Sequence, residues 1–148
     1  MKKIIWISSY PKSGNTFLRA MLSAFFYSKE GIFKQDYLKN IPEFPRDFFE
    51  LKSSNNFLNE IKEYEKIQKK ISSANKEIVF LKTHLANLTI NKILPTINKD
   101  CSMCSIYIIR DPRNVILSLK NHYNLGIKEC LNFLTNDKNF ICMKNKEL

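Results

Sequence analysis

A short turn between two regular patterns constrains the fold of this chain more than any other feature of its sequence. The apolar run from Lys3 to Ser8 predicts a β-strand, and the segment Tyr10–Arg19, YPKSGNTFLR, follows it and opens a helical pattern. Gly14 lets the backbone come close to a ligand, and the following helix directs its unpaired N–H groups and the positive end of its dipole toward the turn. Lys12 adds a full positive charge. Together these features predict a cradle for a phosphate or sulfate group.

The helix after the turn has an apolar face at spacing i, i+3, i+4 and i+7, formed by Leu18, Met21, Leu22 and Phe25. We expect this face to lie against a core. The turn itself differs from the ATP- or GTP-binding P-loop, G-x-x-x-x-G-K-[ST], because Lys12 precedes the glycine instead of following it.

A second junction of strand and helix follows later in the chain. Ser105–Ile109 is predicted to be a buried strand that runs directly into Arg110. Asp111 suits an N-cap and Pro112 the first helical position, so a helix should begin there. Its apolar stripe is Val115, Ile116, Leu119 and Tyr123. Arg110 would lie at the C-terminal end of a strand, where open α/β sheets bind ligands, and a guanidinium there can bind phosphate through two hydrogen bonds.

Between these two junctions, the segment Ile78–Leu85 reads as a short apolar strand that ends in the polar residues Lys82, Thr83 and His84. A single histidine is more often structural than catalytic. The position of His84 at a strand end, between two segments suited to anions, favours a functional role. His122 lies on the later helix without such a context, and we interpret it as structural or pocket-lining.

The three segments together resemble the motifs of the sulfotransferases that use PAPS (3′-phosphoadenosine 5′-phosphosulfate). That family has a 5′-phosphosulfate loop close to Y-P-K-S-G-T-T-W-L, a K-T-H segment and a 3′-phosphate motif R-D-P-R-x-x-x-x-S. In this chain Asn15 replaces the first Thr and Phe17 replaces the Trp. The resemblance extends from Lys3 to Tyr123. It implies an α/β, P-loop-like, three-layer fold with a parallel sheet.

The resemblance also implies the reaction, which is transfer of the sulfuryl group of PAPS to an acceptor hydroxyl or amine. In this scheme His84 is the general base, Lys82 contacts the sulfuryl group, and Lys12 stabilises charge on the leaving phosphate oxygen. Arg110 and Ser118 would hold the 3′-phosphate. The other residues expected at PAPS are those of the first turn, namely Lys12, Ser13, Gly14, Asn15, Thr16 and Phe17. No metal is required.

The family is usually longer than this chain, and its C-terminal R-K-G-x-x-G loop has no counterpart here. We therefore interpret residues 1–148 as one domain, the PAPS-binding N-terminal part of a sulfotransferase, apparently truncated at the C-terminus. Two alternatives stay open: a non-catalytic remnant that binds PAP or PAPS, and a P-loop nucleotide kinase. The acceptor, whether a small molecule or a glycan, is not specified by the sequence.

Composition and residue spacing argue against a nucleic-acid-binding protein, a zinc protein and a membrane-spanning protein. The net charge of +10 comes from lysines scattered along the chain, which does not predict a nucleic-acid groove. Cys101 and Cys104 form a C-x-x-C without a suitably spaced second pair, so we expect no zinc and reduced thiols in the cytoplasm. No segment is long and apolar enough to span a membrane.

Three segments between the first turn and the strand predicted for Ser105–Ile109 carry further structural expectations. Pro42, Phe44, Pro45, Phe48 and Phe49 form either part of an acceptor pocket or, slightly favoured, part of the core. A charged helix is predicted for residues 56–73, with Leu58, Ile61, Ile67 and Ile71 on its inner side. A short helix is predicted for 88–94, stopped by Pro95.

Overall fold

The computed structural model describes residues 2–48, 57–74, 77–90 and 94–136. The chain forms two compact units, Met1–Ile109 and Arg110–Leu148.

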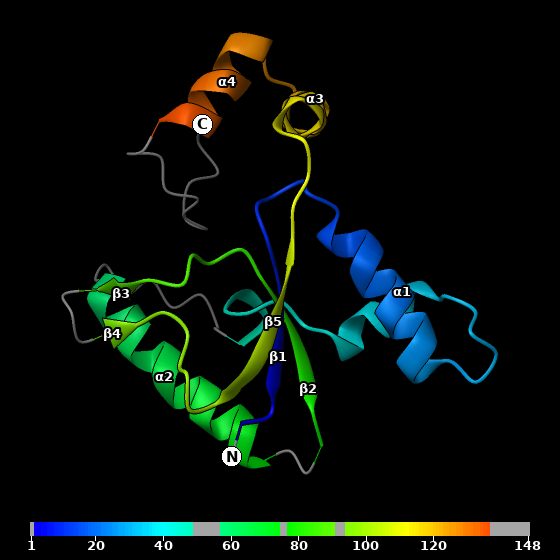
Figure 1. Cartoon of the computed structure of the whole chain (residues 1–148), viewed down its shortest axis with the longest axis vertical. Helices are drawn as coiled ribbons and strands as arrows, with labels where there is room; N and C mark the ends of the chain where they lie inside the picture. Colours follow the sequence, from blue (N-terminus) through cyan, green and yellow to red (C-terminus); the bar gives the residue numbers. More distant parts are fainter. Residues whose placement is uncertain (1, 49–56, 75–76, 91–93, 137–148) are drawn as a thin grey trace. The chain divides into compact units, whose positions relative to one another are not determined.

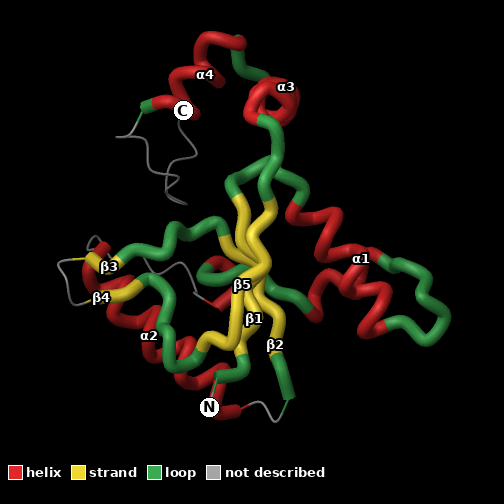
Figure 2. Tube along the Cα trace, viewed as in Figure 1, coloured by secondary structure: helices red, strands yellow, loops and turns green. Residues whose placement is uncertain are grey.

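The first unit is built on a three-stranded parallel sheet, in the order β2-β1-β5 (Figures 1 and 2). Its central strand is β1 (Ile4–Ser9), with β2 (Val79–Thr83) on one side and β5 (Ser102–Ile108) on the other. Ile7 pairs with Lys82 of β2 and with Ile106 of β5. Because all three strands are parallel, their C-terminal ends meet at the same edge of the sheet.

Helices cover the sheet on both faces, α1 (Asn15–Tyr27) on one and α2 (Phe57–Ala74) on the other (Figure 1). Side chains of β1 alternate between the two faces, as a strand requires. One cluster joins Ile4 and Trp6 to residues of α2, namely Ile61, Tyr64 and Ile71. The opposite cluster contains Ile7 and the α1 residues Leu18 and Leu22. This arrangement confirms the predicted three-layer α/β fold with a parallel sheet.

The segment 42–44 lies beside β2 and contributes to the core. Lys82 donates its N–H to the carbonyl of Pro42 and accepts one from Phe44, at 2.9 and 2.8 Å. The Phe44 ring is buried and meets the rings of Trp6 and Tyr64 edge to face, with centroids 5.4 Å apart in both pairs. Of the two alternatives for these aromatics, Phe44 therefore belongs to the core, whereas Phe49 lies outside the described residues.

The helix predicted for 56–73 is confirmed as α2, but the helix predicted for 88–94 is wrong. The described residues there form an antiparallel pair, β3 (Thr89–Ile90) and β4 (Leu94–Pro95). Thr96 closes the pair, since its N–H donates to Leu88 O at 2.9 Å and its hydroxyl oxygen accepts from Leu88 N at 3.0 Å. These hydrogen bonds join Leu88 to Thr96, eight residues later in the chain, and apolar spacing alone does not reveal them.

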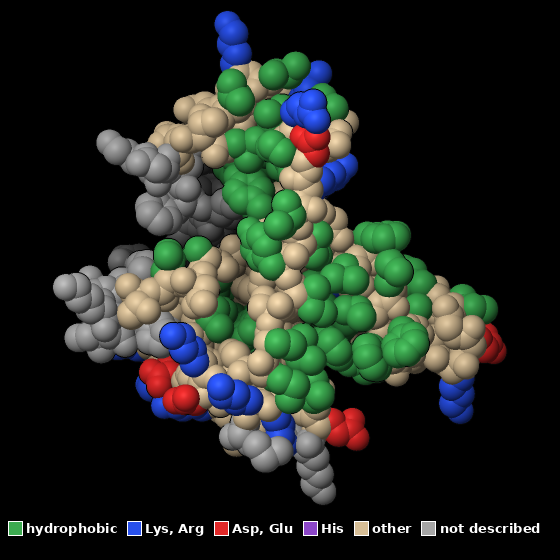
Figure 3. Space-filling view, in the orientation of Figure 1, with side chains coloured by type: hydrophobic (Ala, Val, Ile, Leu, Met, Phe, Trp, Pro, Cys, Tyr) green, Lys and Arg blue, Asp and Glu red, His purple; other side chains and the backbone are tan. Residues whose placement is uncertain are grey.

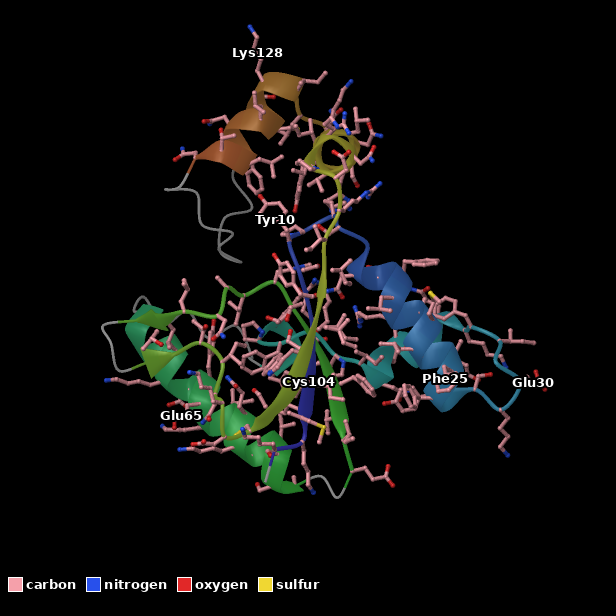
Figure 4. All side chains as sticks on the ribbon, in the orientation of Figure 1. Tyr10, Phe25, Glu30, Glu65, Cys104 and Lys128 are labelled. Carbon is pink, nitrogen blue, oxygen red and sulfur yellow. The ribbon has the colours of Figure 1, made fainter. Side chains whose placement is uncertain are left out.

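Two predictions of burial in the first unit are also wrong. Met21 and Phe25 of α1 are 55% and 76% exposed, because α1 meets the sheet through Leu18, Leu22 and Phe26 instead. Most of β5 is exposed as well, including Met103, Ile106 and Tyr107, because the two hydrophobic clusters lie on β1 and β2 and take in Ile108 alone among the β5 side chains. Figure 3 shows the resulting hydrophobic surface over β5 and α1, where Figure 4 labels Cys104 and Phe25.

The second unit contains α3 (Pro112–Tyr123) and α4 (Ile127–Thr135). The start of α3 is as predicted, because Asp111 Oδ1 accepts the N–H of Arg113 at 2.9 Å and Pro112 occupies the first turn. Val115 and Leu119 are buried together with Cys130 of α4, whereas Tyr123 at the end of the predicted stripe is exposed. Asn124, in the left-handed conformation, ends α3.

The exposed strand β5 should make the chain associate with itself, because no described residue pairs with its outer edge and a strand edge with apolar side chains can pair with another chain. Replacing Tyr107, which is 63% exposed, by lysine should weaken this association. Sedimentation velocity over a range of protein concentrations measures the effect.

Ile32→Lys is the matched control, since it adds the same charge at an exposed apolar residue outside the sheet. An equal loss of association in both variants would show that net charge, not the β5 edge, governs self-association.

Candidate active site

All three sequence motifs follow the C-terminal ends of strands in the parallel sheet. The turn 10–14 follows β1, His84 comes directly after β2, and Arg110 comes two residues after β5 and begins the second unit. Figure 4 labels Tyr10 just beyond β1. This is the edge at which open α/β sheets bind ligands, and β1 lies where the chain connections diverge to either side.

The turn after β1 has the backbone geometry of an anion cradle. The Ser13 N–H donates to Tyr10 O at 3.2 Å, and both Lys12 and Gly14 have positive φ, 67° and 104°. Gly14 is the N-cap of α1, which no side chain caps. The N–H groups of the first helical turn are thus left without a side-chain acceptor at this end of the helix. Lys12 holds a left-handed conformation that costs a residue with a side chain roughly 1–2 kcal/mol.

The His84 ring is held in one tautomer by the end of β1. Its Nδ1 lies 2.7 Å from Ser9 O and 3.3 Å from Ser9 Oγ. A carbonyl oxygen can only accept, so Nδ1 carries the proton and Nε2 of the neutral ring is the basic nitrogen. Burial lowers the pKa of His84, and nearby Lys82 lowers it further, against the opposing effect of the Ser9 hydrogen bond. The ring is therefore neutral near pH 7, as a general base must be.

Asn15, the residue that differs from the motif, points into the protein. Its Nδ2 donates to Ile7 O at 3.0 Å and to Ser9 Oγ at 3.1 Å, and its side chain is buried. Thr16 and Phe17, by contrast, are exposed, with 72% of Phe17 accessible to solvent.

Sequence analysis did not single out Ser9, although its position as the last residue of the strand before the turn was the available signal.

Lys82 is paired with Glu43, which sequence analysis also missed. Its Nζ lies 2.7 Å from Glu43 Oε2, and the two side chains are only 12% and 15% exposed. The pair forms because Glu43 makes a parallel bridge with Lys82 beside β2. No local pattern in the sequence indicates a contact between residues so far apart in the chain.

Arg19 joins α1 by hydrogen bonds to the segment that leads to Glu43. Its Nη2 donates to the carbonyls of Leu38 and Ile41, at the end of the 3₁₀ helix η1 (Gln35–Asn40). Burial lowers the pKa of Arg19, and the charges of Glu43 and Asp47 oppose this effect. This arginine thus has a structural role in orienting the segment beside β2.

The remaining two predicted site residues belong to the second unit. Arg110 is exposed and directly precedes the N-cap of α3, and Ser118 is half-buried on the same helix. Arg113 forms an ion pair with Asp111, with 2.6 Å between Arg113 Nη2 and Asp111 Oδ2.

A family model described as a sulfotransferase domain matches residues 2–140. The chain belongs to this sulfotransferase family. The match includes the turn after β1, His84 and the start of α3, and it spans nearly the whole sequence. A search of curated proteins found no match.

The described residues of this sulfotransferase domain contain neither a cluster of metal ligands nor a membrane-spanning helix. Among those residues, no group of three or more His, Cys, Asp or Glu side chains could hold a metal ion. None of the helices in the described ranges is both long and apolar enough to cross a membrane.

Glu43→Gln should lower the free energy of unfolding by about 1–3 kcal/mol, because it removes a charged hydrogen bond and leaves Lys82 with little access to water. Urea unfolding followed by circular dichroism measures the loss. The control is Asp36→Asn, which neutralises a carboxylate in the exposed ion pair with Lys39 and should have little effect. Equal effects of the two substitutions would show that the Glu43–Lys82 pair does not stabilise the fold.

Proposed function

We propose that this sulfotransferase domain transfers the sulfuryl group of PAPS to an acceptor hydroxyl or amine. The observation that carries the proposal is the ring of His84, whose basic Nε2 is set by the Nδ1 hydrogen bond to Ser9. Ser9 immediately precedes the anion cradle, so the candidate base and the candidate phosphate site are joined through one residue. This combination is what in-line transfer from a bound phosphosulfate to a deprotonated acceptor requires.

The turn after β1 is suited to the 5′-phosphosulfate end of PAPS. Backbone N–H groups of residues 13–16, with the hydroxyls of Ser13 and Thr16, would hold the phosphate, and Lys12 would add its charge. The exposed ring of Phe17 would contact the adenine. Arg110 and Ser118 would hold the 3′-phosphate, which distinguishes PAPS from ATP. PAPS itself supplies the activated sulfuryl group.

The reaction needs one proton acceptor and a stabilised leaving group. His84 Nε2 takes the proton of the acceptor O–H or N–H, and the acceptor atom forms a bond to sulfur. The bond between sulfur and the 5′-phosphate oxygen breaks, and its electron pair leaves on PAP. Lys12 stabilises the charge on that oxygen, and Lys82 stabilises the charge on the transferring group. For this role Lys82 has to share its Nζ between Glu43 and the sulfuryl oxygens.

The acceptor is proposed to be a small molecule or a glycan, and neither a nucleic acid nor a metal takes part. A cytoplasmic location is proposed from the thiols of Cys101, Cys104 and Cys130, which are unpaired cysteines.

Calorimetric titration with PAP, with ADP and with ATP plus Mg²⁺ tests the proposal, together with transfer of labelled sulfate from PAPS to a panel of hydroxyl and amine acceptors. PAP should bind best, and label should appear in an acceptor. PAP binding without transfer to any acceptor would favour a non-catalytic remnant. Tighter binding of ATP with Mg²⁺ would favour a nucleotide kinase.

Arg110→Ala and Ser118→Ala should each weaken binding of PAP much more than binding of adenosine 5′-phosphosulfate, which lacks the 3′-phosphate. Loss of a charged hydrogen bond at Arg110 should raise the dissociation constant for PAP by roughly tenfold to a hundredfold. Arg46→Ala removes an exposed arginine outside the motif and is the control. Equal losses for the two nucleotides would overturn the assignment of Arg110 and Ser118.

His84→Ala should lower turnover by about 10²-fold to 10⁴-fold. It should leave PAP affinity nearly unchanged, because a general base acts on the acceptor. Lys12→Ala should reduce both PAP affinity and turnover. Comparison of single-turnover rates with dissociation constants separates the two effects.

The pH dependence of turnover gives a further check on His84. Since its pKa lies below the usual value of about 6.5, turnover should persist below that pH and fall only as the pH passes through the lowered pKa. His122→Ala should leave this pH dependence unchanged, and retention of activity in His84→Ala would eliminate the general-base role.

A further inference from the structure

The residue that departs from the phosphosulfate-loop motif has its side chain turned away from the cradle. Asn15 is buried, and its Nδ2 bonds to Ile7 O and Ser9 Oγ, both on β1. The amide orientation is fixed by Ile7, because a carbonyl requires an N–H donor facing it. The side chain of Asn15 therefore acts on β1, and only the backbone of this residue faces the turn.

Asn15 and His84 both lie within hydrogen-bond distance of Ser9. The Ser9 hydroxyl oxygen accepts from Asn15 Nδ2 at 3.1 Å and lies 3.3 Å from His84 Nδ1, while Ser9 O accepts from the same Nδ1 at 2.7 Å. Ser9 is buried, so its two oxygens have little solvent to replace these partners. The position of Ser9 thus determines where the Nδ1 proton of His84 is directed.

The hydrogen bonding of Asn15 is incomplete. Its Oδ1 is buried and accepts no hydrogen bond from the described part of the protein. A buried acceptor without a donor costs free energy, and a hydroxyl or aliphatic side chain would avoid that cost. The two donor bonds to β1 are the compensating feature, and they lead to Ser9 and His84.

We propose that Asn15 is a positioning residue that acts through Ser9 to hold the Nδ1–H tautomer of His84 and so keeps Nε2 basic toward the acceptor. The proposal rests on the proposed function for its catalytic meaning, but the tautomer itself is a property of the protein without any ligand. The side chain of Asn15 bonds to β1 and takes no direct part in the proposed chemistry. Its effect is transmitted by the buried hydrogen bonds that join α1, β1 and the residue after β2.

The test is long-range proton–nitrogen NMR of the histidine rings in the ligand-free chain. Neutral His84 should carry its proton on Nδ1, and exposed His122 serves as an internal reference. Asn15→Ala should shift the His84 tautomer equilibrium toward Nε2–H by about twofold to tenfold, the effect of losing a neutral hydrogen bond. Ser9→Ala should act in the same direction, and the double variant should shift it no further, because both changes break one connection.

Asn121→Ala, the same truncation at an exposed position of α3, is the matched control and should leave His84 unchanged. If Asn15→Ala fails to fold, Asn15→Leu and Ser9→Ala replace it, since each retains most of the buried volume and removes the hydrogen bond between Asn15 and Ser9. The proposal is overturned if His84 carries its proton on Nε2 in the unsubstituted protein. It is also overturned if folded Asn15 variants leave the tautomer unchanged.

Kinetics distinguish failure of this inference from failure of the proposed function. With PAPS and an acceptor, Asn15→Ala should lower kcat in proportion to the fraction of the Nδ1–H tautomer that is lost and leave the dissociation constant of PAP within about twofold, because the backbone N–H remains. Absence of sulfate transfer in every variant, with the NMR shift present, refutes the proposed function and leaves the positioning role of Asn15 intact. A lower kcat without a tautomer shift refutes the positioning role alone.

Discussion

The central position of β1 is the constraint on which the rest of the first unit depends. β1 pairs with β2 on one side and β5 on the other, and its side chains enter the hydrophobic clusters on both faces of the sheet. A strand held in this way has little freedom, so the turn that leaves its C-terminal end is held in place as well. The left-handed conformation of Lys12 and the helix start at Gly14 are kept by that support.

Hydrogen bonds join the polar groups at the C-terminal ends of β1 and β2 to their neighbours. Ser9 receives hydrogen bonds from Asn15 and His84, and the backbone of Lys82 joins β2 to the segment that carries Glu43. Partial burial strengthens each of these interactions and also lowers the pKa of His84. The same lack of solvent therefore fixes the geometry of the candidate base and keeps it neutral.

Apolar periodicity predicted which residues could be buried, but not which of them are. The i, i+3, i+4, i+7 pattern of α1 is real, yet the sheet contacts Leu18 and Leu22 and leaves Phe25 exposed. In the same way the apolar run of β5 predicted a strand, but the two hydrophobic clusters take in Ile108 alone among its side chains. Periodicity describes one element, whereas burial requires a second element on the other side of the contact.

The sequence alone determined those features that depend on neighbouring residues. Asp111 and Pro112 specify the start of α3, Gly14 specifies the turn before α1, and the order of strands and helices indicates a parallel α/β sheet. The partners of the functional side chains were decided only by the tertiary structure. Ser9 and His84, or Glu43 and Lys82, meet because parallel pairing brings distant segments side by side, and the local rules for caps, turns and periodicity extend over only a few residues. For the same reason the inward orientation of Asn15 could not be read from its motif, since it depends on acceptors that β1 presents beneath the turn.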